Sequence, residues 1–142
     1  MNISKFTQKS VQAVQDLEKV AYEYGNQEVE QEHLLYALLT QEDSLILKLI
    51  EKMEINKDYF INTVKKALDA KVKVSGGDLR FGQYLNKSLV NAENEAKAMG
   101  DEYVSVEHLF LSLLTQPSPG MKKIFSEFGI TRERFLQALS TV

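Results

Sequence analysis

The sequence predicts an all-α fold in which eight helices form a pseudo-two-fold duplicate of a four-helix repeat. The first observation is internal similarity. Shifting the chain by 75 residues aligns 6–67 with 81–142 without a gap, and 16 of the 62 pairs are identical, where average residue usage gives roughly four. The second observation is that apolar residues recur every three or four positions, which is the spacing of one helical face. Because a half of this size would be marginally stable alone, we expect both copies to share one core.

The identical residues are concentrated in two short segments. Glu-His-Leu at 32–34 recurs at 107–109, and Leu-Leu-Thr-Gln at 38–41 recurs at 113–116. Clustering of this kind indicates a tandem duplication, because chance matches would be scattered along the chain. We therefore expect each element of the first copy to have a counterpart 75 residues later.

The first helix of each copy is predicted to end at a glycine. An amphipathic stretch of 17 residues precedes Gly25, and the equivalent stretch precedes Gly100. Glycine at this place is typical of a left-handed cap at the C-terminus of a helix. Thr7 and Gly82, which lie at the start of the two stretches, are acceptable N-terminal caps.

Three shorter helices are predicted to follow in each copy. Ser105 is a good cap for the second helix of the second copy, whereas Glu30 is a poorer cap at the matching place. We place Pro117 and Pro119 in the loop before the third helix of the second copy. The second, third and fourth helices are predicted at 31–40, 45–53 and 57–70 in the first copy, and at 105–115, 120–128 and 131–141 in the second.

A connector at residues 68–80 separates repeat one (6–67) from repeat two (81–142), and we expect residues 1–142 to form one domain. Two adjacent glycines favour a flexible connector. Its two valines alternate with polar residues, but over too few positions to form a stable sheet by themselves.

The composition excludes several classes of protein. The 142 residues include 17 basic and 20 acidic side chains and no cysteine, which excludes a disulfide framework, a thiolate zinc site and a cysteine nucleophile. No apolar run approaches the ~20 residues needed to cross a bilayer. The net charge of −3 argues against nucleic acid as a partner. The first ten residues lack the apolar stretch of a secretory signal, so we expect a cytoplasmic protein without membrane contact.

Three longer motifs identify a known family. They are Lys-Phe-Thr at 5–7, Gly-Asn-Gln-Glu-Val at 25–29, and Gly-Asp-Glu-Tyr-Val-Ser-Val-Glu-His-Leu at 100–109. Together they resemble the Clp N-terminal domain, the duplicated helical module at the front of Clp-type AAA+ unfoldases and disaggregases. The resemblance covers nearly the whole chain, and the segment 31–39 looks most like the ClpB disaggregase branch.

This resemblance implies a binding module: the N-terminal substrate-recognition domain of an ATP-dependent ClpB-type disaggregase. Such a domain binds unfolded or aggregated polypeptides and passes them to a downstream AAA+ ring. The chain has no Gly-x-x-x-x-Gly-Lys-Ser/Thr loop, and its Gly76-Gly77 pair is followed by Asp78. We therefore expect no cofactor and no enzymatic activity in this chain, with ATP and magnesium in downstream modules. We expect a monomeric domain, a hexameric parent, and adaptor proteins as further partners.

The resemblance also implies where clients bind. In ClpB-like N-domains, contacts with unfolded substrate are attributed to a groove near the start of the first helix and to the Gly-Asp…Glu segment of the second copy. The matching residues here are Thr7, Asp101 and Glu107, with Leu109 and Phe110 as candidate apolar members. Each has a purely structural alternative: a helix cap, a solvated loop residue, a carboxylate at a helix N-terminus and, for the last two, a helix core.

A second hypothesis is an adaptor-docking or phosphoarginine-reading N-domain of a ClpC- or ClpA-type unfoldase that feeds a protease. In the ClpC branch, the glutamates that match Glu32 and Glu107 are associated with phosphorylated arginine. That branch usually has Gly-Thr before its Glu-His, where this chain has Gln31 and Val106. A third hypothesis is a structural partner of a Clp complex that binds no client.

His33 and His108 suggest a fourth hypothesis, a metal-dependent hydrolase, because each follows a glutamate. Neighbouring residues on a helix point about 100° apart, so a Glu-His pair does not chelate a metal. A His-x-x-x-His spacing and a nucleophile with its base are both missing. We therefore predict no catalytic and no metal-binding residue, and we expect both histidines to be packed and hydrogen-bonded.

Overall fold

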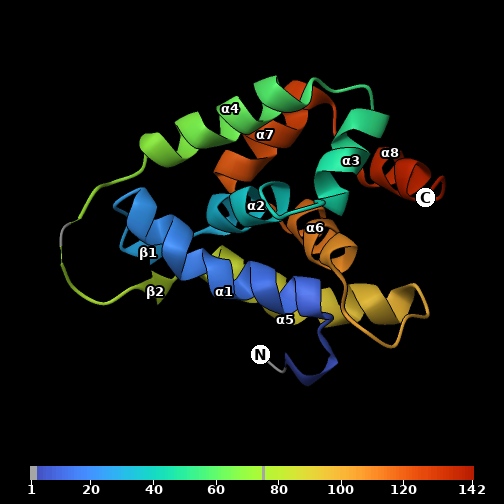
Figure 1. Ribbon diagram of the computed structural model, residues 1–142, viewed down its shortest axis with the longest axis horizontal. Coiled ribbons are helices and arrows are strands. Elements are labelled where there is room, and N and C mark those ends of the chain that lie inside the picture. The colour runs from blue at the N-terminus through green and yellow to red at the C-terminus, as the bar shows by residue number, and fades with distance from the viewer. Residues whose placement is uncertain (1–2, 75) are drawn as a thin grey trace.

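The computed structural model describes residues 3–74 and 76–142, and within them the chain forms eight α-helices (Figure 1). Residues 1, 2 and 75, the last in the predicted connector, lie outside the described residues. The all-α fold class is confirmed, because the other elements are a 3-10 turn (Ile3–Lys5) and two strands of two residues, β1 (Glu28–Val29) and β2 (Arg80–Phe81). The helices are α1 (Gln8–Glu23), α2 (Gln31–Leu39), α3 (Leu45–Lys52), α4 (Lys57–Asp69), α5 (Gln83–Ala98), α6 (Val106–Thr115), α7 (Pro119–Phe128) and α8 (Arg132–Leu139).

The first helix of each repeat begins and ends as predicted. At the start of α1, Thr7 Oγ1 accepts a hydrogen bond from the Ser10 amide at 3.3 Å. At the start of α5, Gly82 takes the cap position without a side-chain bond. Gly25 (φ 68°) and Gly100 (φ 73°) have left-handed backbone just after the two helices, a conformation that glycine adopts without steric cost.

One predicted boundary is wrong. Pro119 is the first residue of α7 and not part of the preceding loop. A proline costs nothing at the first position of a helix, because the amide hydrogen that it lacks has no partner there. Ser118 caps this helix, and its hydroxyl accepts from the Met121 amide. The other predicted helix ends agree with the structure to within two residues.

The helices pair across the two repeats (Figure 1). The helix α3 of repeat one packs against α8 of repeat two, and α4 packs against α7, so the third helix of each repeat contacts the fourth helix of the other. The long first helices α1 and α5 each pack against both second helices, α2 and α6, which also contact each other. This arrangement is the pseudo-two-fold packing that the internal similarity predicts.

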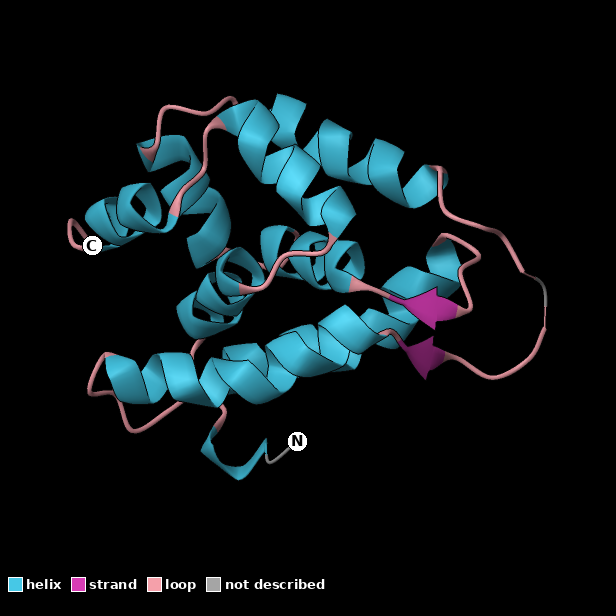
Figure 2. Cartoon of the chain, turned by 180° about the vertical axis from the view of Figure 1, so that it is seen from behind, coloured by secondary structure: helices cyan, strands magenta, loops and turns pink. Residues whose placement is uncertain are grey.

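Two short parallel pairings join the repeats, and Figure 2 draws the first of them, β1 with β2, in magenta. Val29 pairs with Phe81 in the β1–β2 ladder, and Phe6 forms an isolated parallel bridge with Val104. Phe81 and Val104 lie 75 residues after Phe6 and Val29, so the two pairings are equivalent. The residues before the first helix of each repeat are therefore bonded to the other repeat.

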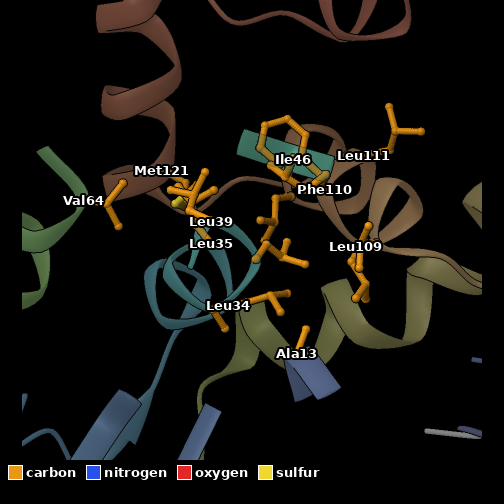
Figure 3. Packing of buried hydrophobic residues seen from close by; sticks show 14 of the residues in the cluster. Ala13, Leu34, Leu35, Leu39, Ile46, Val64, Leu109, Phe110, Leu111 and Met121 are labelled. Atoms are coloured by element: carbon orange, nitrogen blue, oxygen red, sulfur yellow. The ribbon is translucent and has the colours of Figure 1, made fainter. Parts of the chain in front are cut away.

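Both repeats contribute to one buried apolar cluster (Figure 3). The equivalent residues Leu38 and Leu113 are both fully buried, as are the equivalent residues Ile46 and Met121. Burial of this cluster removes the apolar faces of both halves from water, which is the main favourable term in folding. Residues of both halves therefore meet in one buried apolar core.

Candidate functional site

A histidine organises the turn before the second helix of each repeat. The Glu30 amide donates to His33 Nδ1 at 2.9 Å, and the Ser105 amide donates to His108 Nδ1 at 2.8 Å. Because Nδ1 is the acceptor in both rings, the ring proton lies on Nε2. The other ring nitrogen of each is also engaged, so both histidines are packed and hydrogen-bonded, as predicted.

The partner of Nε2 differs between the repeats. His33 Nε2 donates to Asn26 Oδ1 at 2.9 Å, whereas His108 Nε2 donates to Asp101 Oδ2 at 2.8 Å. Burial and the nearby Lys71 ammonium lower the pKa of His33 to about 4, so this ring is neutral near pH 7. Within residues 3–74 and 76–142, no group of three or more His, Cys, Asp or Glu side chains could hold a metal ion.

In repeat two, the predicted polar residues gather around the loop at 101–107. The Thr7 amide donates to the Val104 carbonyl at 3.0 Å, which fastens the start of α1 to this loop. The Asp101 side chain is 47 % exposed, although one of its oxygens accepts from His108. Glu107 lies half-buried in the first turn of α6.

Glu107 has no ion pair with any basic side chain in the described part of the chain. Tyr103 lies between the two carboxylates in sequence, and 55 % of its surface is exposed. Our sequence reasoning did not select this residue, although an aromatic side chain inside an acidic loop was a usable signal. The loop, which also contains the exposed Glu102, therefore presents three carboxylates and one aromatic ring to solvent.

The prediction that Leu109 and Phe110 line an open groove is wrong. Both side chains are fully buried (Figure 3). The Phe110 ring stacks on Phe135 at a centroid distance of 4.5 Å and meets Phe125 edge-on at 5.8 Å. The helix α6 turns this face into the shared core, so neither residue offers surface to a client.

In repeat one, the glutamate equivalent to Glu107 is closed off by a lysine of the connector. Glu32 is only 5 % exposed. Lys71 Nζ lies 3.3 Å from Glu32 Oε1 and 2.8 Å from Glu30 Oε2. Burial alone would lower the pKa of Lys71, but the two glutamates outweigh burial and raise it. The ammonium therefore stays charged, and it neutralises the buried carboxylate.

The first turn of α7 covers the other side of the Glu32 carboxylate. A Cβ atom added at Gly120 would lie 2.5 Å from Glu32 Oε2, so only glycine permits this approach. Glu32 itself lies in the first turn of α2, where the helix dipole favours a carboxylate. Glu32 is thus held between a lysine of the connector and a helix of the other repeat.

Residues 71–74 of the connector are bonded to repeat one. Lys73 Nζ donates to the Tyr24 carbonyl at 2.6 Å, and Asn26 Nδ2 donates to the Val72 carbonyl at 3.1 Å. The Val74 amide donates to the Gly25 carbonyl at 2.9 Å. A cavity of about 410 Å³ lies between this segment and the loop at 26–30. We call residues 71–74 the strap.

The described helices include none that is both long enough and apolar enough to cross a membrane. The chain is thus a duplicated all-α domain in which a histidine fixes one turn of each repeat and an acidic loop is exposed in repeat two. The profile of the Clp repeat (R) N-terminal domain family matches residues 5–139. The chain belongs to this family of chaperone N-terminal domains.

Individual relatives agree with this assignment. The chain is 39 % identical to the chaperone protein ClpB of Nitratidesulfovibrio vulgaris (strain Hildenborough) over 148 residues, which cover all of this chain and 17 % of that protein. It is also 39 % identical to ClpB of Clostridium tetani over 147 residues, with the same coverage. The chain thus spans about one sixth of the length of these relatives.

Solved structures share the fold. The Hsp104 N-terminal domain from Candida albicans gives a TM-score of 0.81 at 20 % identity, covering 95 % of this chain and 89 % of that chain. A ClpV N-domain in complex with a VipB peptide gives a TM-score of 0.71 at 22 % identity, covering 97 % of this chain and 89 % of that one.

Proposed function

We propose that this chain is the client-binding N-terminal module of a ClpB-type disaggregase, and that repeat two carries its binding surface. In this proposal the module captures unfolded or aggregated polypeptides in the cytoplasm and passes them to a hexameric AAA+ ring. The ring belongs to downstream modules, which bind ATP and magnesium, while this chain itself uses no cofactor. The observation that carries the proposal is the half-buried Glu107, which has no ion pair among the described residues and lies in the loop that also exposes Asp101 and Tyr103.

The chemistry of this loop suits an unfolded polypeptide. An unfolded segment exposes basic side chains, apolar and aromatic side chains, and backbone amides without partners. The carboxylates of Asp101 and Glu107 attract the basic groups and accept hydrogen bonds from the amides. The Tyr103 ring provides an apolar surface with a polar tip. Thr7 contributes by fixing the start of α1 against the loop.

Two further considerations support weak, reversible capture. The ClpV N-domain that shares this fold was solved in complex with a VipB peptide, so a domain of this shape can bind a peptide. Ordering a flexible chain on binding costs conformational entropy, which lowers the affinity. Weak binding is what a module needs if it must release its client to a ring.

The test is binding of a labelled 15-residue peptide of leucine, phenylalanine and arginine, followed by fluorescence anisotropy. We expect Glu107→Gln to weaken binding by about tenfold, because it removes a charge-assisted hydrogen bond. The matched control is Glu133→Gln, since Glu133 is an exposed carboxylate in the first turn of another helix, α8. Equal affinity of the Glu107 variant and the wild type would contradict the proposal.

The phosphoarginine-reading alternative keeps one supporting observation, the presence of both Glu32 and Glu107 at equivalent places. It predicts that a peptide containing phosphoarginine binds more tightly than its arginine counterpart. Because Lys71 already neutralises Glu32, we favour the disaggregase proposal. Under that proposal the phosphate weakens binding, since it is repelled by the acidic loop.

A further inference from the structure

The repeats have equivalent sites in different states. Thr7, Asp101 and Glu107, the residues of the proposed client surface, correspond at the offset of 75 to Gly82, Asn26 and Glu32. The scaffold is kept, because α5 also begins beside the partner loop: the Gly82 amide donates to the Val29 carbonyl at 2.8 Å. Repeat one therefore has the geometry of a client site, including a glutamate at the equivalent position.

The two sites differ in what contacts the glutamate. At Glu32 a cation is already present, the Lys71 ammonium, which contacts two carboxylates and whose side chain is only 17 % exposed. The strap that carries this lysine follows repeat one in the sequence, and residues 71–74 contact the loop and helix of that repeat. Among the described residues, no basic side chain forms an ion pair with Glu107 of repeat two.

We infer that the strap is an autoinhibitory element: Lys71 occupies in repeat one the position that a basic client side chain takes in repeat two. Displacing it opens a second client site, with Glu30 and Glu32 as acceptors. This inference rests on the proposed function of Glu107. The inference also determines which client can displace Lys71. The buried Glu32 carboxylate needs another cation when Lys71 leaves. Only a segment with lysine or arginine can exchange with the strap.

The surroundings of the strap permit this exchange. The cavity of about 410 Å³ is bordered by Asn26, Glu30 and Val72, so an incoming side chain has space next to the ammonium. Val72 is 80 % exposed. Besides the ion pair, the strap is held by hydrogen bonds to the loop at 24–26 and by Lys73, which also lies over the Tyr24 ring. While the strap is bound the site is closed, so the apparent affinity for a client is multiplied by the fraction of time that the strap is displaced.

The test is the binding stoichiometry of the arginine-containing peptide, measured by isothermal titration calorimetry. We expect the wild type to bind one peptide and Lys71→Met to bind two, because the substitution removes the ammonium but keeps an apolar stem. The apparent affinity at repeat one should rise about tenfold or more. Adding Glu32→Gln to Lys71→Met should abolish the second site. The matched control is Lys122→Met, an exposed lysine on α7, which should keep one site.

A second variant keeps the inference testable if Lys71→Met does not fold. Lys71→Gln keeps hydrogen-bond donors toward Glu30 and Glu32 without the charge, and it should also gain a second site. One peptide per domain in every folded Lys71 variant, with the Glu107 site intact, would overturn the strap inference and leave the proposed function standing. A site at Glu32 in the variants, without one at Glu107 in the wild type, would overturn the proposed function and support the strap.

Discussion

In repeat one, Glu32 lies buried between Lys71 and the first turn of α7, whereas in repeat two the equivalent Glu107 is half-buried and has no ion pair with any described residue. Other equivalent features are the same in both repeats: the histidine bonded to the preceding turn, the left-handed glycine and the buried leucines. The comparison separates the shared histidines, glycines and leucines, which hold the fold, from the two glutamates, whose surroundings differ. The duplicated fold therefore holds two equivalent glutamates in different surroundings, one covered and one partly exposed.

The connector accounts for the closure of repeat one. It runs back from the end of α4 to β2, and this path brings Lys71 to Glu30 and Glu32. The covalent link between the copies thus places a cation against the Glu32 carboxylate.

The largest expected effect tests whether the halves share a core. Leu38→Ala and Leu113→Ala, at equivalent and fully buried positions, should each cost about 2–5 kcal/mol of unfolding free energy through lost burial and a cavity. Urea denaturation followed by circular dichroism should show one transition for each variant. Two separate transitions in either variant would mean that the halves unfold independently.

The second prediction concerns pH. The pKa of His33 is about 4 in the folded chain and about 6.5 when unfolded. The unfolded state therefore binds more protons between these values. Stability is fully present above pH 6.5 and is lost as the pH falls toward 4, by roughly 3 kcal/mol. Denaturation at a series of pH values measures this loss, and NMR titration of the His33 ring measures the pKa.

A variant of Asn26 sharpens the comparison of the two histidines. Asn26→Asp gives His33 the carboxylate partner that His108 has. A nearby negative charge favours the protonated ring, so we expect the pKa of His33 to rise above its value of about 4. An unchanged or lower pKa would show that burial and the Lys71 ammonium outweigh the new carboxylate.

The third prediction contrasts the two glutamates directly. Glu32→Gln should cost about 1–2 kcal/mol, because it removes one carboxylate from a largely buried ion pair with Lys71. Glu107→Gln should change stability by no more than about 0.5 kcal/mol, as for an unpaired surface group. Thermal unfolding of both variants under one buffer condition makes the comparison. Equal losses would mean that Glu107 is also structural.

The smallest effect separates charge from hydrogen bonding at Asp101. Asp101→Asn should leave stability within about 0.5 kcal/mol, because an amide oxygen can accept from His108 as Asn26 does from His33. Asp101→Ala should cost about 1 kcal/mol, since it leaves the ring nitrogen without its partner. Both variants should weaken peptide binding in the anisotropy assay. Unchanged binding by Asp101→Asn would remove this charge from the proposed surface.

The helices and the histidine roles could be predicted from the sequence because they depend on local patterns. Apolar spacing, caps such as Thr7 and the left-handed Gly25 act within one helix or turn. The Lys71–Glu32 pair could not be predicted, because it depends on how a connector closes onto residues about 40 positions earlier. Its only signal was a lysine-rich connector beside an acidic repeat.

The error at Leu109 and Phe110 has a different cause. The resemblance places a client groove near these residues, but helical spacing alone does not say which apolar face of α6 turns inward. The structure answers this through Phe110, which stacks on Phe135 inside the core. Tyr103, in the loop before α6, provides the exposed aromatic surface instead.

The openness of repeat two and the closure of repeat one can be tested in a single titration. The ¹⁵N-labelled wild-type domain is titrated with the arginine-containing peptide, and amide shifts are mapped on the chain. The prediction is that shifts concentrate at Thr7 and residues 101–107, while residues 26–32 stay unmoved until the strap is displaced at high peptide concentration. Shifts of equal size in both loops from the first addition, or shifts confined to residues 26–32, would contradict it.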